Sequence, residues 1–227
     1  MNILIIAGHG DGDCGAVGNG YNEADLTREV AKLLKPKLED YADVAIADTK
    51  KNWYKHIIKK GNYFNFKLYD YVLEIHLNSS DKESANGTEI YVTTSEKSYG
   101  VETNIVKGIS DIGFTNRGVK KTNYSLIWHI KKQGVSSALL EVCFISNEND
   151  MKLYQSKKNE IIKAIADGII KGFNLKRRDD LAGDCNLLAS VGIINSPEYW
   201  AKGGCYSDSN TVQLIKKFAS YVRGNIN

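Results

Sequence analysis

Two histidines occupy positions from which they could bind one metal ion. His9 stands between two glycines directly after the apolar run 3–7, and His76 lies near the end of the β-rich run 69–77. Because ligands bind at the carboxyl ends of strands in parallel α/β sheets, both histidines can face a single crevice. Glu23, at the first turn of a helical pattern, can reach the same place. Two histidines and one carboxylate form a common catalytic zinc set, in which water takes the fourth position.

A fourth candidate, Glu141, is a charged residue inside the otherwise apolar run 137–144. Burial of a carboxylate costs free energy unless a metal, hydrogen-bond donors or a chemical role compensates for it. A partly desolvated carboxylate beside a metal is suited to accept a proton from an activated water and then to donate it. The residues therefore predict a zinc hydrolase in which Glu141 is the general base.

Each of these four residues also has a purely structural interpretation when it is taken alone. His9 and His76 could be ordinary loop and strand-end histidines. Glu23 could stabilise the helix dipole, and Glu141 could pair with a buried base. The occurrence of all four together favours the catalytic interpretation.

Three further residues are assigned structural or supporting roles. His56 lies in a basic and aromatic stretch, and we expect a partly exposed helix residue. His129 lies in the run 125–130, which is interpreted as a strand, and we expect a hydrogen-bonded core histidine. Glu74 lies two residues before His76 and so points to the same strand face, where it either orients His76 or forms an ion pair.

The elements that must position these residues alternate along the chain. Apolar and β-rich runs predict strands at residues 2–7, 44–47, 69–77, 88–94, 125–130 and 137–144. Helical spacing of apolar residues predicts helices at 23–38, 99–112, 148–173, 181–191 and 210–222, and residues 116–118 are expected to form a turn. This alternation favours an α/β fold with a mostly parallel sheet that helices cover on both faces.

A change in composition near residue 176 predicts two domains. The charged run 176–180 separates a catalytic domain at 1–175 from a small helical module at 179–227. A module of about 50 residues is near the lower size limit for a part that folds alone. We therefore expect one main domain with a small appended module.

Composition and charge exclude several function classes. The 30 basic and 27 acidic residues give a net charge of +3, which is too mild to indicate a nucleic-acid partner. No run approaches the ~18 apolar residues of a membrane span. The first apolar run is shorter than the ~7–15 residues of a signal-peptide core, so we expect synthesis in the cytoplasm without an export signal. The four cysteines form no CxxC pair, which argues against a cysteine zinc site.

Five sequence blocks, taken in order, resemble the zinc-dependent N-acetylmuramoyl-L-alanine amidases of the amidase 3 type. The resemblance extends from Asn2 to about Leu175. A lone GHG is a weak signal, but five blocks in order are specific. The blocks are IIAGHG with its Asp/Gly-rich loop, NEADL, EIHLNSS followed by GTEIYV, NRGVK, and ALLEVCFISNEND.

The resemblance implies a specific fold, site and reaction. The fold would be one twisted six-stranded α/β sheet with flanking helices. Zinc would be bound by His9, Glu23 and His76, and Glu141 would be the catalytic residue. The reaction would be hydrolysis of the amide that joins the lactyl group of N-acetylmuramic acid to L-alanine of the stem peptide. This chain departs from the pattern at Glu74-Ile75, where many members carry a small polar residue, and at residues 62–67, which lack an Arg that the family usually carries.

The lack of an export signal resembles phage endolysins, which reach the cell wall through a holin pore. The stretch 190–200 is similar to helical modules that follow amidase domains in clostridial lysins. We therefore expect a phage endolysin of a clostridial host, with bacterial peptidoglycan as its partner. Residues 179–227 would bind the wall or mediate self-association, and a docked stabilising appendage is the alternative.

Two other function classes remain as alternatives. A non-catalytic peptidoglycan-binding protein could use an amidase fold, but the presence of all four polar residues argues against it. A zinc exopeptidase would need a second metal and more acidic ligands, and the sequence shows no second constellation of that kind.

Overall fold

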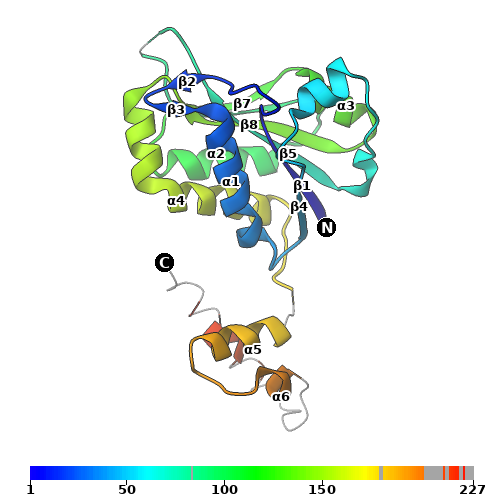
Figure 1. The fold of residues 1–227 in the computed structure, drawn as a ribbon, viewed down its shortest axis with the longest axis vertical. Helices are drawn as coiled ribbons and strands as arrows, with labels where there is room; N and C mark the ends of the chain where they lie inside the picture. Colours follow the sequence, from blue (N-terminus) through cyan, green and yellow to red (C-terminus); the bar gives the residue numbers. More distant parts are fainter. Residues whose placement is uncertain (83, 179–180, 202–211, 213–214, 220–221, 223–227) are drawn as a thin grey trace. The chain divides into compact units, whose positions relative to one another are not determined.

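The computed structural model describes residues 1–227 with the exception of 83, 179–180, 202–211, 213–214, 220–221 and 223–227. Contacts divide the chain into two units, Met1–Lys176 and Arg177–Asn227. Every residue predicted to carry chemistry lies in the first unit, where helices enclose a central sheet (Figure 1).

The central sheet of the first unit has six strands and is mostly parallel, as the sequence and the resemblance led us to expect. β1, β4, β5 and β8 pair in parallel, β6 is antiparallel to β8, and β7 is parallel to β6. In spatial order the strands are β4 (Asp43–Ile46), β1 (Asn2–Ala7), β5 (Tyr71–Asn78), β8 (Ser136–Phe144), β6 (Thr88–Val92) and β7 (Asn116–Lys121).

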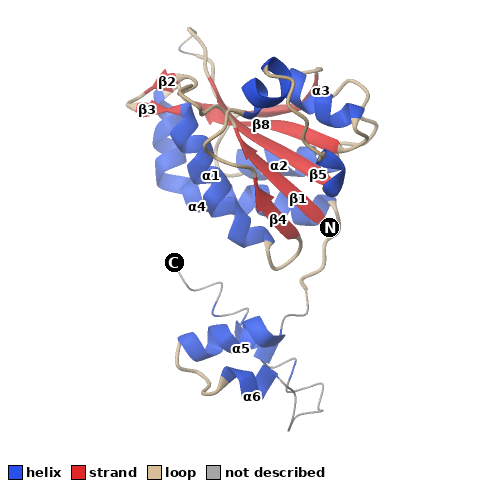
Figure 2. Cartoon of the chain, turned by 45° about the vertical axis from the view of Figure 1, so that its right-hand side comes forward, coloured by secondary structure: helices blue, strands red, loops and turns tan. Residues whose placement is uncertain are grey.

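Helices cover both faces of this sheet, which confirms the expected layers (Figure 2). One face packs on a core shared by α1 (Glu23–Leu38), α2 (Gly100–Ser110) and α4 (Glu148–Gly172). The other packs on α3 (Ser125–Lys132) and a short helical turn, η1 (Lys55–Lys59).

The pleat of β1 explains why its sequence is apolar throughout. Ile3 and Ile5 join the core beneath α1, whereas Leu4 and Ile6 join the core beneath α3. A strand that is buried on both faces needs apolar side chains at every position. β1 therefore ends where the apolar run ends, and the polar Gly-His-Gly segment begins a loop at the carboxyl edge of the sheet.

Two predicted elements of the first unit were wrong. Residues 125–130, predicted as a strand, lie in helix α3, where Leu126, Ile127 and Ile130 are buried. Their spacing is that of one helix face, and a short apolar run cannot distinguish a helix from a strand by itself. His129 is therefore a helix residue.

The second error concerns residues 116–118, which were predicted as a turn and form the start of β7. The register between β6 and β7 slips by one residue here, and Gly118 has a φ of 79°. A glycine in the left-handed region is typical of a β-bulge. The turn signal in the sequence therefore marks a bulge inside a strand.

The second unit contains the helices α5 (Leu181–Ser190) and α6 (Pro197–Ala201) and a small apolar cluster that includes Cys185, Leu188 and Ile215. Residues 215–219 are helical, and other parts of the predicted helix 210–222 lie outside the described residues. No helix of the described residues is both long and apolar enough to cross a membrane.

Candidate functional site

His9 is presented by a tightly held turn at the end of β1. Its φ is 64°, a left-handed conformation that non-glycine residues seldom adopt and that needs support from the surrounding structure. Arg28 of α1 gives this support, because its guanidinium donates to the main-chain oxygens of Gly8 (2.9 Å) and His9 (3.0 Å).

The ring of His9 is oriented by a carboxylate. Nδ1 of His9 lies 3.2 Å from Oδ2 of Asp13, and the same oxygen accepts a hydrogen bond from Nδ2 of Asn52 at 2.9 Å. The opposite ring nitrogen, Nε2, then lies 3.0 Å from Oε2 of Glu23. A histidine ligand typically has its second nitrogen fixed in this way.

Glu23 is the first residue of α1, and the helix cap sets its place. Oδ1 of Asn22 accepts a hydrogen bond from the main-chain nitrogen of Asp25 (2.9 Å), so the helix begins at Glu23. The Glu23 side chain is buried and accepts main-chain hydrogen bonds from Ala16 and Leu77, each at 3.0 Å. These bonds direct it away from its own helix and toward the end of β5.

His76, near the end of β5, lies between two carboxylates. Nδ1 is 2.9 Å from Oε1 of Glu23, and Nε2 is 3.1 Å from Oε1 of Glu74. A Cβ atom at Gly8 would lie 2.4 Å from Cε1 of His76, so only glycine leaves room for the ring there. The predicted position of Glu74 on the His76 face of the strand is confirmed.

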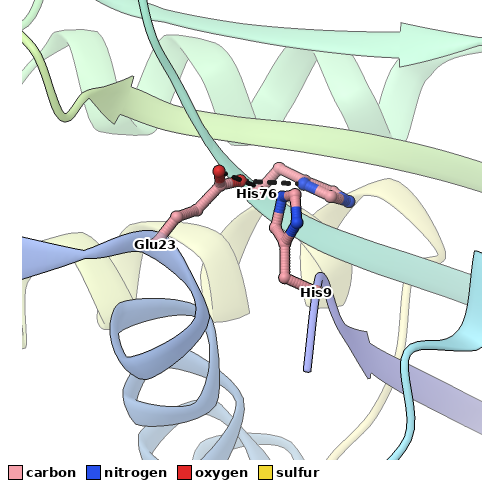
Figure 3. Close-up of side chains that lie close together, drawn as sticks. All are labelled: His9, Glu23 and His76. Atoms are coloured by element: carbon pink, nitrogen blue, oxygen red, sulfur yellow. Dashed lines mark hydrogen bonds and ion pairs between the residues drawn. The ribbon is translucent and has the colours of Figure 1, made fainter. Parts of the chain in front are cut away.

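The predicted ligands His9, Glu23 and His76 are therefore brought together from three different elements. One possible ligand atom from each lies within 4.8 Å of the others. Figure 3 shows the three side chains turned toward one another from the end of β1, the start of α1 and β5.

This donor set fits a catalytic zinc ion. Two imidazole nitrogens and one carboxylate are typical of such sites. The contacts of Glu23 with His9 and His76 are 3.0 and 2.9 Å. Donor atoms around a tetrahedral zinc, each at ~2.1 Å, lie roughly 3.4 Å apart, so small side-chain shifts would suffice.

The charges of the cluster also favour a cation. Burial by itself would raise the pKa of Glu23, but hydrogen bonds from His76 and His9 hold that pKa well below its usual range. Burial lowers the pKa of His76, but the bonds to Glu23 and Glu74 raise it well above the ordinary value. The cluster thus stabilises positive charge, which protons on the imidazoles or a divalent cation can supply.

Glu141 lies on β8 directly beside His76, since the two residues are register partners in the parallel pair β5–β8. Its Oε2 atom is fully buried and has no hydrogen-bond partner among the described residues. Burial, the largest cause, raises the pKa of Glu141 to about 7, and the charges of Glu23, Glu89 and Glu74 add to this effect against the opposing charge of His76. A carboxyl group with such a pKa can both accept and donate a proton near neutral pH.

A cavity of about 320 Å³ opens beside the two histidines. Its walls include the aromatic side chains of Trp53, Tyr54 and Tyr124 and the polar side chains of Asp13 and Asn52. A substrate that enters this cavity would meet the rings of His9 and His76. The cavity therefore gives access to the two histidines, whereas Glu23 and Glu141 are not among the residues that line it.

Two of the supporting residues were missed by the sequence analysis. Asp13 follows His9 by four residues in a Gly-rich loop, and that proximity was a usable signal. Asn52 lies 39 residues beyond Asp13, and nothing local connects it with the site.

The other two histidines do not join the cluster. His56 lies in η1, and its Nδ1 is 3.0 Å from the amide nitrogen of Asn62. The ring of His129 packs edge-on against Phe66, and its Nε2 lies 3.5 Å from Nε2 of Gln133. His56 is the partly exposed helix residue that was expected, whereas His129 is only partly buried, so the expectation of a core histidine was wrong.

Comparisons with known proteins point to one family. The sequence profile of the Amidase_3 family, described as N-acetylmuramoyl-L-alanine amidase, matches residues 3–171. The chain is 31% identical to the N-acetylmuramoyl-L-alanine amidase LytC of Bacillus subtilis over 174 residues, which cover 74% of this chain and 34% of LytC. It is 27% identical to the endolysin of Bacillus phage SPP1 over 78% of this chain and 67% of that protein. The chain therefore spans about a third of the length of LytC and about two thirds of the endolysin.

A solved structure has a similar fold. It is the catalytic domain of CwlV, an N-acetylmuramoyl-L-alanine amidase from Bacillus (Paenibacillus) polymyxa var. colistinus. The TM-score is 0.62 at 25% identity, and the match covers 78% of this chain and all of that domain. The similarity thus concerns a complete catalytic domain.

Proposed function

We propose that this chain, which belongs to the Amidase_3 family of N-acetylmuramoyl-L-alanine amidases, hydrolyses the amide between N-acetylmuramic acid and L-alanine in bacterial peptidoglycan. The observation that carries the proposal is the convergence of His9, Glu23 and His76 beside the buried and unpartnered Oε2 of Glu141. Family membership indicates the substrate class, and the cluster supplies a means of hydrolysis.

The proposal includes zinc as the cofactor. His9 would bind through Nε2, His76 through Nδ1, and Glu23 through its carboxylate, because these atoms face one another. A zinc ion bound there would polarise the scissile carbonyl and lower the pKa of a nearby water. Asp13 and Glu74 would hold the second nitrogens of the two histidines and so keep the ligand nitrogens directed inward.

Glu141 performs the proton transfers in this scheme. It accepts a proton from the attacking water as the bond from oxygen to the carbonyl carbon forms. It then donates that proton to the nitrogen of L-alanine as the carbon–nitrogen bond breaks. Burial raises the pKa of Glu141, which favours a group that must be a base first and an acid afterwards.

The test is a comparison of Glu141→Gln with wild type on purified cell walls. We expect at least a ~100-fold loss of turnover with the zinc content retained, because removal of a general base typically costs 10²–10⁴ in rate. Glu148→Gln is the matched control: it makes the same change at an exposed helix residue and should keep wild-type activity. Mass spectrometry of the wild-type digest should show intact stem peptides with free L-alanine amino groups.

Several results would contradict the proposal. Wall lysis by Glu141→Gln at the wild-type rate would remove Glu141 from the mechanism. Wall binding without cleavage by wild type would indicate a binding protein, and release of single amino acids would indicate an exopeptidase. In the same assay His76→Ala should lose its metal, as measured by elemental analysis.

We further propose that the biological role is lysis of a clostridial host by a phage. The similarity to the SPP1 endolysin supports the role, and the stretch 190–200 supports the host class. In this proposal the protein is made in the host cytoplasm and acts on the wall after release. Expression in a bacterium should then lower the turbidity of the culture only after the membrane is permeabilised; lysis without permeabilisation would contradict the release step.

A further inference from the structure

A second polar cavity, of about 480 Å³, adjoins the candidate site, and we call it the Glu89 groove. Its lining residues include Asn78, Ser80, Glu89, Arg117, Lys120 and Phe144.

The Glu89 groove lies on the same face of the sheet as the candidate site. Asn78 follows His76 by two residues on β5, so both side chains point to the same side. Glu89 of β6 is the register partner of Glu141 of β8. His76, Glu141 and Glu89 therefore form a row across three neighbouring strands, and the groove begins one strand beyond the proposed base.

Glu89 anchors two cations in this groove. Its carboxylate is almost fully buried and accepts hydrogen bonds from Nε of Arg117 (2.5 Å), from Nζ of Lys120, and from Asn78 and Tyr91, each at 2.7 Å. Arg117 also stacks on Phe144, with 4.9 Å between the guanidinium carbon and the ring centre. Two fixed cations against one carboxylate leave the groove with positive charge.

Both cations keep capacity for a further partner. Arg117 uses Nε for Glu89 and Nη1 for the main-chain oxygen of Asn86 at 3.4 Å, while Nη2 makes no hydrogen bond with a described residue. The side chains of Arg117 and Lys120 are 33% and 38% exposed, so a ligand in the groove can reach them. Cations that are already held in place lose little entropy when they bind an anion.

We infer that the Glu89 groove binds a carboxylate of the peptide part of the substrate, through Arg117 and Lys120. The inference rests on the proposed amidase function. Partners across antiparallel strands have Cβ atoms ~4.5–5.5 Å apart, and a peptide advances ~3.3–3.6 Å per residue. With the scissile amide at Glu141, a carboxylate on the second residue of the peptide reaches the two cations.

The experiment compares two substrates of the zinc-loaded full chain: N-acetylmuramoyl-L-Ala-D-Glu and its diamide, in which both carboxylates of the peptide are amidated. Wild type should show a KM at least about tenfold lower for the acid, because charge-assisted hydrogen bonds to a carboxylate are among the stronger ones. Lys120→Met should raise the KM for the acid by about tenfold, with kcat and the KM for the diamide unchanged.

Lys121→Met is the matched control. It removes the same charge from the next residue of β7, whose side chain points to the opposite face, and it should leave both KM values as in wild type. Glu89 keeps Arg117, Asn78 and Tyr91 as donors in Lys120→Met, and a thermal unfolding curve verifies that this variant is folded.

The outcomes separate this inference from the amidase function. Equal KM values for acid and diamide in wild type, or an unchanged KM in Lys120→Met, would overturn the carboxylate site and leave the amidase function standing. Turnover of neither substrate by wild type would contradict the amidase function itself. Calorimetric titration with L-Ala-D-Glu and its diamide then decides the inference: tighter binding of the acid that Lys120→Met abolishes supports it, and equal binding overturns it.

Discussion

Glu74 lies at a position where this chain departs from the pattern that the sequence resembles. It is 5% exposed and its Oε1 lies 3.1 Å from Nε2 of His76. A buried carboxylate in that position accepts the Nε2 proton, so that Nδ1 presents its lone pair toward Glu23 and His9. In the proposed zinc site, Glu74 would therefore hold His76 in the tautomer whose Nδ1 can bind the metal.

Replacement of Glu74 should weaken metal binding more than it lowers the stability of the fold. We expect Glu74→Ala to lower the zinc affinity 10–100-fold, the typical effect of loss of a partner behind a histidine ligand. Glu74→Gln should lower the zinc affinity less than Glu74→Ala does, because the amide oxygen of Gln can still accept a hydrogen bond from Nε2 of His76. Competition with a chelator measures both affinities; equal affinities of wild type and Glu74→Ala would show that Glu74 does not act through His76.

At the scale of elements, the polar site exists because the side chains on one face of the sheet change from apolar to polar toward its carboxyl edge. In β5 the residues that alternate with the apolar core are Val72, Glu74, His76 and Asn78, of which only the first is apolar. In β8 and β6 the same face carries Glu141 and Glu89. The opposite face stays apolar throughout, because α1, α2 and α4 cover it.

The contact between α2 and α4 depends on glycine. A Cβ atom at Gly168 of α4 would lie 2.7 Å from Cγ1 and 2.8 Å from Cα of Ile105 in α2. We expect Gly168→Ala to lower the free energy of unfolding by about 1–3 kcal/mol, because overpacking displaces the helices. Chemical denaturation measures the change.

Gly100, the first residue of α2, gives the matched control for this prediction. A Cβ atom there meets no atom within 4 Å, so Gly100→Ala should be neutral or stabilise the fold by up to about 1 kcal/mol. Equal stabilities of the two variants would show that Gly168 does not pack tightly against Ile105.

The elements that were predicted wrongly show where local patterns fail. The apolar residues of the run 125–130 are compatible with a strand or with one face of a helix. The run forms helix α3, and its apolar face packs on the sheet. The NRG segment carries a turn signal, and the pairing of β7 with β6 turned that signal into a bulge. In both cases the deciding contact involves residues far away in the sequence.

At the scale of the whole molecule, each unit has its own apolar cluster among the described residues. The predicted boundary, a domain at 1–175 followed by a module at 179–227, remains a prediction about independent folding. For the module we propose binding to the cell wall. Tyr199, which is 49% exposed, offers an aromatic surface of the kind that stacks on sugars.

A chain that ends at Lys176 tests whether the first unit carries the catalysis and the second unit the wall binding. We expect it to keep zinc binding and turnover of a soluble muramoyl peptide, because its core and site are complete, and to bind purified clostridial walls at least about tenfold more weakly. Sedimentation with walls measures the binding. Undiminished wall binding would refute the proposed role, and a lower oligomeric mass of the shortened chain would assign the module to self-association instead.

The candidate residues, and roughly where they lie along the chain, can be predicted from local sequence patterns. Apolar runs that end at His9 and His76, a helix start at Glu23 and a charge inside an apolar strand at Glu141 are local signals, since each depends on neighbours within a few residues. The mostly parallel sheet follows from the same patterns. The predicted roles of these four residues await the experiments described above.

The surroundings of those residues depend on how distant parts of the chain pack together. The pairing of His76 with Glu141 and the position of Glu89 beside Glu141 follow from strand order and register, and the hydrogen bond from Asn52 to Asp13 joins two loops far apart in the sequence. Strand order and register arise from contacts between segments far apart in the chain. The spacing of residue types within one segment does not predict these contacts. The same is true of the Glu89 groove, whose cations come from β7 and whose floor comes from β5 and β6.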